Sequence, residues 1–324
     1  MTSRRPITTS SAPFALRAAL VAVAVAGISF CGGSPQTPSV QTPSAPTPAP
    51  TSLPALPLPY GQATASASCR TAAPPGSTCS GLAVACPAIP NAVATLWISR
   101  PASTASNRGT IVLTTGAEGT LLDAASLTRA MIATFVADGL TVVQVGWDPP
   151  GIWGDARARS VACRYATAAK WIYDNVHVGG RSRLFAAQGT SGGAAQIAFG
   201  LAHFGLGDLL DLANLGGGPP TCPLCACDRV TAIEHLLPAS LDFDLCSTPP
   251  PINRDPLLGY PATVVRFFLG DQDVNNPTVD HGKRYYDAIT SAKSYTTVPN
   301  TPHVVESTQA GVDAYVASVR AALK

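Results

Sequence analysis

The sequence is poor in charge. Only 12% of its 324 residues are charged, with 21 Lys and Arg against 19 Asp and Glu. Three of the arginines lie within residues 1–31, which leaves 18 basic against 19 acidic side chains in the rest of the chain. A near-neutral chain without a basic stripe does not indicate a nucleic-acid surface, so we expect no nucleic-acid partner.

Long hydrophobic runs are also scarce. The run from Phe14 to Phe30 is about 17 residues long and contains Arg17, whereas a membrane-spanning helix needs about 20 apolar residues. Arg4 and Arg5 precede the run and Cys31 follows it, which is the layout of an export signal. We therefore predict that residues 1–31 direct export and that the mature protein acts outside the cytoplasm.

The end of this segment resembles a bacterial lipoprotein signal, in which the cysteine becomes the lipidated N-terminus. Cys31 occupies that position, but Phe30 stands where such signals prefer Gly or Ala. Two alternatives follow: a membrane anchor through Cys31, or simple cleavage and secretion.

Residues 32–59 are rich in proline, serine and threonine. Such a segment cannot bury a core, and it favours extended, unpaired backbone. We interpret it as a linker, which is a tether if Cys31 is lipidated and a disordered leader if it is not.

Eight cysteines follow Cys31, and an even number in an exported chain favours disulfides. Seven of the eight lie in two turn-rich clusters, near residues 69–86 and 222–246. The pairing cannot be read from the sequence. The second cluster could also bind a structural zinc ion, but we favour disulfides there because an exported protein is not in a reducing compartment. That cluster is Cys222, Cys225, Cys227 and Cys246.

From about residue 90, short runs rich in β-branched and aromatic residues alternate with helical stretches. The clearest helices are 155–176, one that ends at Gly139, and about 309–323. This alternation predicts an α/β domain with a mostly parallel sheet, helices on both faces, and ligands at the carboxyl ends of the strands. We place one globular domain at 60–324, beginning with a cysteine-stapled extension at 60–90. The predicted strands are 92–99, 110–115, 141–147, 183–188, 209–217, 262–270 and 294–300.

Ser191 lies in the stretch QGTSGGA, where a predicted strand gives way to an alanine-rich helix. A tight strand-to-helix turn requires very small residues two before and two after the nucleophile, and Gly189 and Gly193 meet this requirement. The Gly-x-Ser-x-Gly pattern alone is weak, but its place between a strand and a helix is specific. A phosphate-binding loop is excluded because the lysine of that motif is missing.

A serine hydroxyl needs a base, and the base needs an acid to orient it. Of the five histidines, only His303 follows the last predicted strand. The loop after the preceding strand contains Asp271 and Asp273. We favour Asp273 as the orienting acid and Asp271 as a turn residue. We expect the other four histidines to pack inside or lie at the surface.

Ser191, Asp273 and His303 occur in this order at three strand ends, and the chain thereby resembles the α/β-hydrolase family, in particular its serine esterases and lipases. The resemblance covers about residues 90–324. It implies the α/β-hydrolase fold, with these three residues as a catalytic triad. It also implies an oxyanion hole formed by the backbone N–H groups of Gly192 and Ala117, although Thr115 replaces the histidine that is frequent in that loop.

Two further features are expected near this edge of the sheet. Trp147 and Trp153 follow or end the strand at 141–147 and could contact an acyl or aromatic group, with core packing an equally favoured role for Trp147. The cysteine-rich insertion at about 219–256 falls where the family commonly has a cap, and it could equally be a braced surface loop.

The sequence therefore predicts an exported serine hydrolase that cleaves carboxylic esters, either small or polymeric. We expect no metal and no organic cofactor to be required, and no protein partner is implied. Two alternatives stay open: a peptidase or amidase with the same triad, and a non-catalytic binding module on a hydrolase scaffold.

Overall fold

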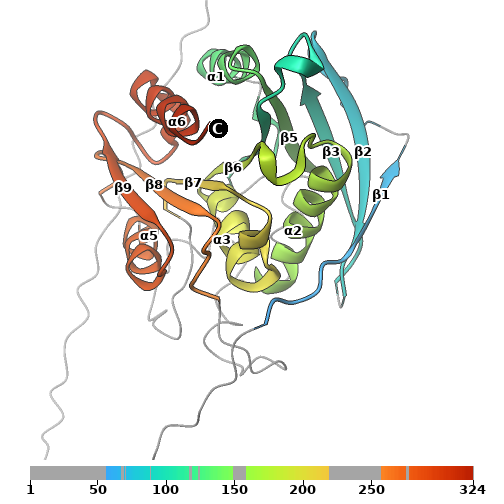
Figure 1. Ribbon diagram of the computed structural model, residues 1–324. Coiled ribbons are helices and arrows are strands. Elements are labelled where there is room, and N and C mark those ends of the chain that lie inside the picture. Colours follow the sequence, from blue (N-terminus) through green and yellow to red (C-terminus); the bar gives the residue numbers. More distant parts are fainter. Residues whose placement is uncertain are drawn as a thin grey trace, which may run out of the picture. The chain divides into compact units, whose positions relative to one another are not determined.

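The computed structural model describes residues 56–66, 69, 71–87, 89–116, 119–122, 125–148, 158–218, 257–274 and 277–323. Within them a nine-stranded sheet carries helices on both faces (Figure 1). The sheet order is β1-β2-β3-β5-β4-β6-β7-β8-β9. Every pairing from β5 through β4, β6, β7 and β8 to β9 is parallel, and β1, β2 and β3 pair antiparallel. The predicted α/β class with a mostly parallel sheet is confirmed.

The seven predicted strands are all present, with ends that differ by a few residues. They are β3 (Ala92–Ser99), β4 (Gly109–Thr114), β5 (Leu140–Asp148), β6 (Leu184–Thr190), β7 (Leu212–Gly216), β8 (Val264–Gly270) and β9 (Lys293–Val298).

The predicted cysteine-stapled extension at residues 60–90 contributes two more strands. They are β1 (Gln62–Ser66) and β2 (Ser77–Ala85), which pair with each other and, through β2, with β3. The cysteine-stapled segment therefore adds two strands to the sheet. The strand signal was weak because the sequence of β2 is rich in Ser, Thr, Gly and Ala, and its residues alternate only partly between buried and exposed.

Helices on the two faces bury two separate cores. On one face, α2 (Ala158–Asn175), α3 (Gly192–Phe204) and α5 (Pro277–Ala288) pack over residues such as Tyr165 and Phe267. On the other face, α1 (Ser126–Ala137) and α6 (Gln309–Ala322) cover a core that includes Phe135 and Tyr315. Both faces of the parallel strands are thus covered, as a parallel sheet requires.

The last helix shows how the local sequence produces an element. The Thr308 side chain accepts a hydrogen bond from the backbone N–H of Gly311 at 3.1 Å, which caps the first turn of α6. Val312, Val316 and Val319 are buried, as their three- and four-residue spacing predicted.

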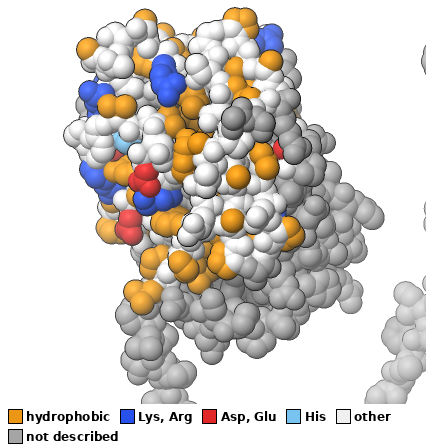
Figure 2. All heavy atoms as spheres, turned by 90° about the vertical axis from the view of Figure 1, so that its right-hand side faces the viewer, with side chains coloured by type: hydrophobic (Ala, Val, Ile, Leu, Met, Phe, Trp, Pro, Cys, Tyr) orange, Lys and Arg blue, Asp and Glu red, His pale blue; other side chains and the backbone are white. Residues whose placement is uncertain are grey.

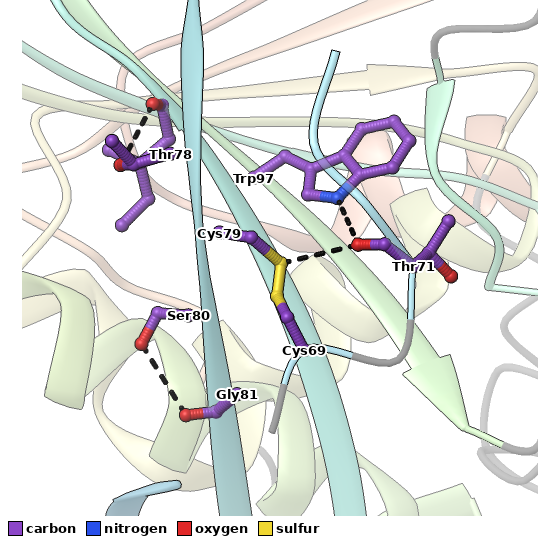
Figure 3. Close-up of a disulfide and its surroundings, with 8 residues drawn as sticks. Cys69, Thr71, Thr78, Cys79, Ser80, Gly81 and Trp97 are labelled. Atoms are coloured by element: carbon purple, nitrogen blue, oxygen red, sulfur yellow. Dashed lines mark hydrogen bonds between the residues drawn. A yellow bond between two sulfur atoms is a disulfide. The ribbon is translucent and has the colours of Figure 1, made fainter. Parts of the chain in front are cut away.

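Two disulfides lie at β2, one local and one that connects it to a helix. Cys69–Cys79 joins the segment before β2 to β2 itself, and the Trp97 indole of β3 donates to the carbonyl of Thr71 beside it at 3.2 Å (Figure 3). Cys86–Cys163 links the end of β2 to α2, and both cysteines are buried. The predicted preference for disulfides is met by these four cysteines. The second cluster, Cys222 to Cys246, lies outside the described residues, as do the predicted signal, most of the linker and the insertion.

The surface on the side of β1 and β2 is chemically mixed. Figure 2 shows hydrophobic, basic and acidic side chains interspersed among the described residues of this face. In the part of the chain that is described, no helix has the length and apolar character needed to span a membrane.

Candidate active site

Ser191 lies at the turn between β6 and α3, with φ 55° and ψ −120°. A positive φ is rare for a residue with a side chain and costs about 1–3 kcal/mol, so the surrounding structure must enforce it. The turn brings the chain close to itself at the two predicted glycines. A Cβ on Gly189 would lie 2.5 Å from the backbone carbon of Gly193, and a Cβ on Gly193 would lie 2.6 Å from the carbonyl oxygen of Thr114. Both positions therefore exclude any larger side chain.

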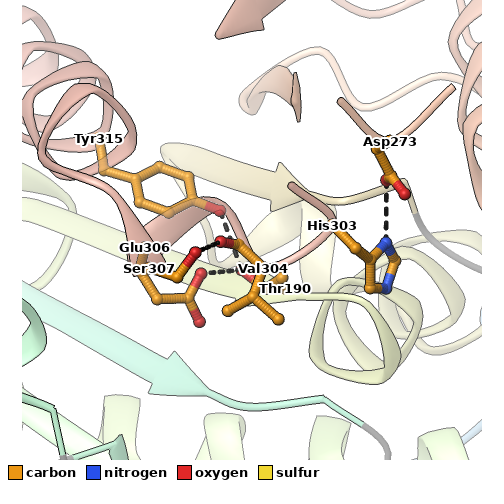
Figure 4. Close-up of polar contacts among 7 residues, drawn as sticks. All are labelled: Thr190, Asp273, His303, Val304, Glu306, Ser307 and Tyr315. Atoms are coloured by element: carbon orange, nitrogen blue, oxygen red, sulfur yellow. Dashed lines mark hydrogen bonds and ion pairs between the residues drawn. The ribbon is translucent and has the colours of Figure 1, made fainter. Parts of the chain in front are cut away.

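His303 and Asp273 meet across two loops. His303 follows β9 and Asp273 follows β8, and the Nδ1 atom of the imidazole lies 2.9 Å from Oδ2 of the carboxylate (Figure 4). Asp273 is 5% exposed. Asp271 is exposed instead, and its Oδ1 accepts a hydrogen bond from the backbone N–H of Thr301 at 3.1 Å. The histidine is thus paired with Asp273. Asp271 instead accepts a backbone N–H in the loop, which agrees with its predicted role as a turn residue.

Ser191 and the His303 ring lie next to two consecutive residues at the end of β7. The backbone N–H of Ser191 donates to the carbonyl oxygen of Gly216 at 2.9 Å. At the next residue, a Cβ on Gly217 would lie 3.1 Å from Cε1 and 3.2 Å from Nδ1 of the His303 ring. The ends of β6, β7, β8 and β9 therefore bring the predicted nucleophile, base and acid to one edge of the sheet.

Candidate oxyanion donors lie at the start of α3. Gly192 is its first residue, and the first N–H groups of a helix have no partner within the helix and favour negative charge nearby. Gly116 approaches from β4, since a Cβ there would lie 3.7 Å from Cβ of Ser191. The loop predicted to supply the second donor thus reaches the serine, while Ala117 itself lies outside the described residues.

The structure favours the packing role for Trp147. Its side chain is 3% exposed, lies in the core on the α2 and α3 face, and donates from Nε1 to Oε1 of Gln196 at 3.0 Å. Trp153 lies outside the described residues.

Two of the other histidines lie in packed surroundings, as expected. His177 has ring nitrogens 3.1 Å from Oγ1 of Thr110 and 2.9 Å from the carbonyl oxygen of Gly180. His203 is 9% exposed and stacks on Phe199. His235 and the side chain of His281 are outside the described residues.

A buried acid near the site was not predicted. Glu306 is 7% exposed, and its Oε2 lies 2.5 Å from Oγ1 of Thr190, the residue before Ser191 (Figure 4). Burial raises the pKa of Glu306, while the Thr190 hydrogen bond and the nearby His303 act to lower it. In the sequence, Glu306 follows two valines and precedes Ser307 and Thr308, a pattern that is also typical of a solvated acid near the start of a helix.

A cavity of about 910 Å³ lies elsewhere in the domain, beside α1. Its lining includes Pro74, Ser99, Arg108, Ile132 and Val136, and none of Ser191, Asp273 and His303. We therefore do not assign the substrate to this cavity.

No protein-family model matches the chain, and no curated protein matches its sequence. Solved structures do resemble it. Carboxyl esterase 2 from the mycorrhizal fungus Tuber melanosporum aligns with a TM-score of 0.52 and 14% identity, covering 78% of this chain and 89% of the esterase.

Two further structures give similar values. A protein from Agrobacterium vitis S4 aligns with a TM-score of 0.52 and 11% identity, covering 76% of this chain and 99% of that one. A single-site variant of the esterase rPPE aligns with a TM-score of 0.50 and 14% identity, covering 77% and 84% of the two chains. At such identities the likeness shows the fold, and the chain has the α/β-hydrolase fold.

Proposed function

We propose that the protein is an exported serine hydrolase that cleaves carboxylic esters through an acyl-enzyme on Ser191. One observation carries the proposal. His303 and Asp273 form a 2.9 Å pair in loops that follow two different strands. The histidine ring packs beside the end of β7, where the carbonyl oxygen of Gly216 accepts the N–H of the strained Ser191. Three regions distant in the chain would not supply this set of groups to one edge without a chemical use for it.

The chemistry follows from the orientation of the imidazole. Because Asp273 accepts a hydrogen bond from Nδ1, the neutral ring carries its proton on Nδ1, and its unprotonated Nε2 can take the proton of Ser191. Oγ of Ser191 then attacks the acyl carbon, and the carbonyl oxygen becomes an oxyanion. His303 gives the proton to the leaving alkoxide, which departs as the alcohol. A water molecule that loses a proton to His303 then releases the acid and restores Ser191.

The start of α3 would stabilise the oxyanion. The backbone N–H of Gly192 is the first proposed donor, and that of Ala117 in the loop after β4 is the second. A helix N-terminus adds a favourable field for negative charge. No step requires a metal or an organic cofactor.

Export and tethering stay predictions from residues 1–59. The two disulfides support export but not tethering, because such bonds persist in oxidising compartments outside the cytoplasm. We propose that the protein is either secreted or anchored through Cys31. The names of two structural neighbours favour an ester over an amide, since both are called esterases.

The test is hydrolysis of short p-nitrophenyl esters by wild type and Ser191→Ala. We expect Ser191→Ala to lose at least about a thousandfold in kcat, because without the nucleophile only binding and oxyanion stabilisation remain. Amide substrates with the same acyl groups, run in parallel, separate an esterase from an amidase. Undiminished ester turnover by a folded Ser191→Ala would refute the proposal.

A further inference from the structure

A buried polar cluster lies behind Ser191, formed by Thr190, Glu306 and Tyr315 (Figure 4). Glu306 comes from the short 3-10 helix η6 (Val305–Ser307), directly after His303, and Tyr315 comes from α6. The Thr190 hydroxyl donates to Oε2 of Glu306 at 2.5 Å and lies 3.0 Å from the Tyr315 hydroxyl. All three side chains are at most 7% exposed.

The direction of these hydrogen bonds is set by the single proton of the Thr190 hydroxyl. Since that proton goes to Glu306, the Tyr315 hydroxyl donates to Thr190. The chain of bonds runs one way and ends on the carboxylate. It joins three elements, α6, the end of β6, and the loop that carries His303.

Gly216, which accepts a hydrogen bond from the Ser191 backbone, lies against the same cluster. A Cβ on Gly216 would overlap the Tyr315 hydroxyl and lie 2.9 Å from Oγ1 of Thr190. The carbonyl oxygen of Gly216 accepts the Ser191 N–H at 2.9 Å. The strained backbone at Ser191 persists only where several surrounding contacts hold it in that conformation, and the cluster supplies such contacts through Gly216.

We propose that Glu306 is a positioning residue, whose hydrogen bond from Thr190 fixes the Ser191 turn relative to the His303 loop. The proposal rests on the proposed function, because it concerns the alignment of the same nucleophile and base. Neither Glu306 nor Thr190 needs to contact the substrate in this role.

A carboxylate is not essential for this hydrogen bond, which allows a sharp test. The amide oxygen of glutamine accepts the same bond from Thr190, so Glu306→Gln keeps the contact. Thr190→Val keeps the shape of the side chain and removes the hydroxyl. Thr263→Val is the matched control. Thr263, directly before β8, is also buried, and its single hydroxyl proton lies within reach of the carbonyl oxygens of Leu210 at 2.7 Å and Gly207 at 2.9 Å.

The experiment measures the rate of Ser191 labelling by a fluorophosphonate, the final labelled fraction, and kcat and KM for p-nitrophenyl acetate. For Thr190→Val we expect the labelling rate and kcat to fall by about tenfold to a hundredfold, since misalignment of a reacting group costs this much. The KM should stay within about twofold and the labelled fraction should reach that of wild type. Glu306→Gln should stay within about fivefold of wild type, and Thr263→Val should lower only the melting temperature.

Three results would overturn the inference. The first is a wild-type labelling rate in Thr190→Val. The second is a fall in kcat of Thr190→Val that is only as large as the fall in its labelled fraction. The third is a fall in labelling rate and kcat in Glu306→Gln as large as in Thr190→Val. If Thr190→Val does not fold, Tyr315→Phe decides, because it removes the donor that orients Thr190. A wild-type labelling rate there would equally overturn the proposal. Failure of the proposed function is distinct, since it would show as ester turnover that survives Ser191→Ala.

Discussion

At the scale of single residues, the two aspartates after β8 offer the clearest contrast. Asp273 pairs with His303, whereas Asp271 is exposed and accepts a backbone N–H. If Asp273 orients the imidazole, Asp273→Asn should lower kcat by about 10³- to 10⁴-fold, because the amide no longer selects the required tautomer. Asp271→Asn should stay within about tenfold, since its amide oxygen can still accept the Thr301 bond. Steady-state kinetics on one ester compares the two, and an equal loss would contradict the assignment.

Glu306 gives a second residue-scale prediction, on stability. Burial raises the pKa of Glu306 above its ordinary value of 4.5. A carboxyl with a higher pKa in the folded state holds its proton more tightly there, so its contribution to stability is present at low pH. That contribution is lost as the pH rises through the folded-state pKa. Glu306→Gln removes this titration.

We therefore expect wild type to lose stability relative to Glu306→Gln as the pH rises from 4.5 toward the folded-state pKa. Urea unfolding of both proteins across this interval measures the difference. Thr263→Val, which changes no titratable group, is the control, and its difference from wild type should be constant with pH. A difference between wild type and Glu306→Gln that is constant with pH would contradict the assigned burial effect.

At the scale of elements, the disulfides hold the antiparallel end of the sheet. Cys86–Cys163 closes a loop with a sequence separation of 77, and Cys69–Cys79 one of 10. A crosslink over a longer loop removes more conformational freedom from the unfolded chain, by about 4.5 kcal/mol for the longer loop against about 2.7 kcal/mol for the shorter.

Replacing Cys86 and Cys163 together with alanine should therefore lower the free energy of unfolding more than the matched replacement of Cys69 and Cys79. Denaturant unfolding of the two double variants makes the comparison. The opposite order would show that strand packing, and not chain entropy, dominates at this edge.

The elements also show what sequence patterns can reveal. Strands β4 to β8 are mostly buried and form dense apolar runs, so they were recognisable from local composition. The edge strand β1 and its neighbour β2 lack that signature, because many of their residues are partly or fully exposed. Glu306 and Thr190 escaped prediction for a related reason: their burial depends on α6 packing over the end of β6, which no local pattern encodes.

At the scale of the whole molecule, the fold explains why predicted site residues could be placed from their order alone. In a parallel sheet the loops after the strands share one edge, so residues at the ends of β6, β8 and β9 converge whatever their separation in sequence. Trp147 shows the limit of this argument. A tryptophan near the end of a strand can point into the core as easily as toward a ligand, and Trp147 points into the core.

The most direct test of the central claim is a mass-spectrometric map of protein treated with a fluorophosphonate. The account predicts one adduct, on the peptide that contains Ser191, and a rate of formation lower by about 10³-fold in His303→Ala. It also predicts that treated wild type loses ester hydrolysis in step with the adduct. Folded protein that hydrolyses esters while Ser191 stays unmodified would contradict the account.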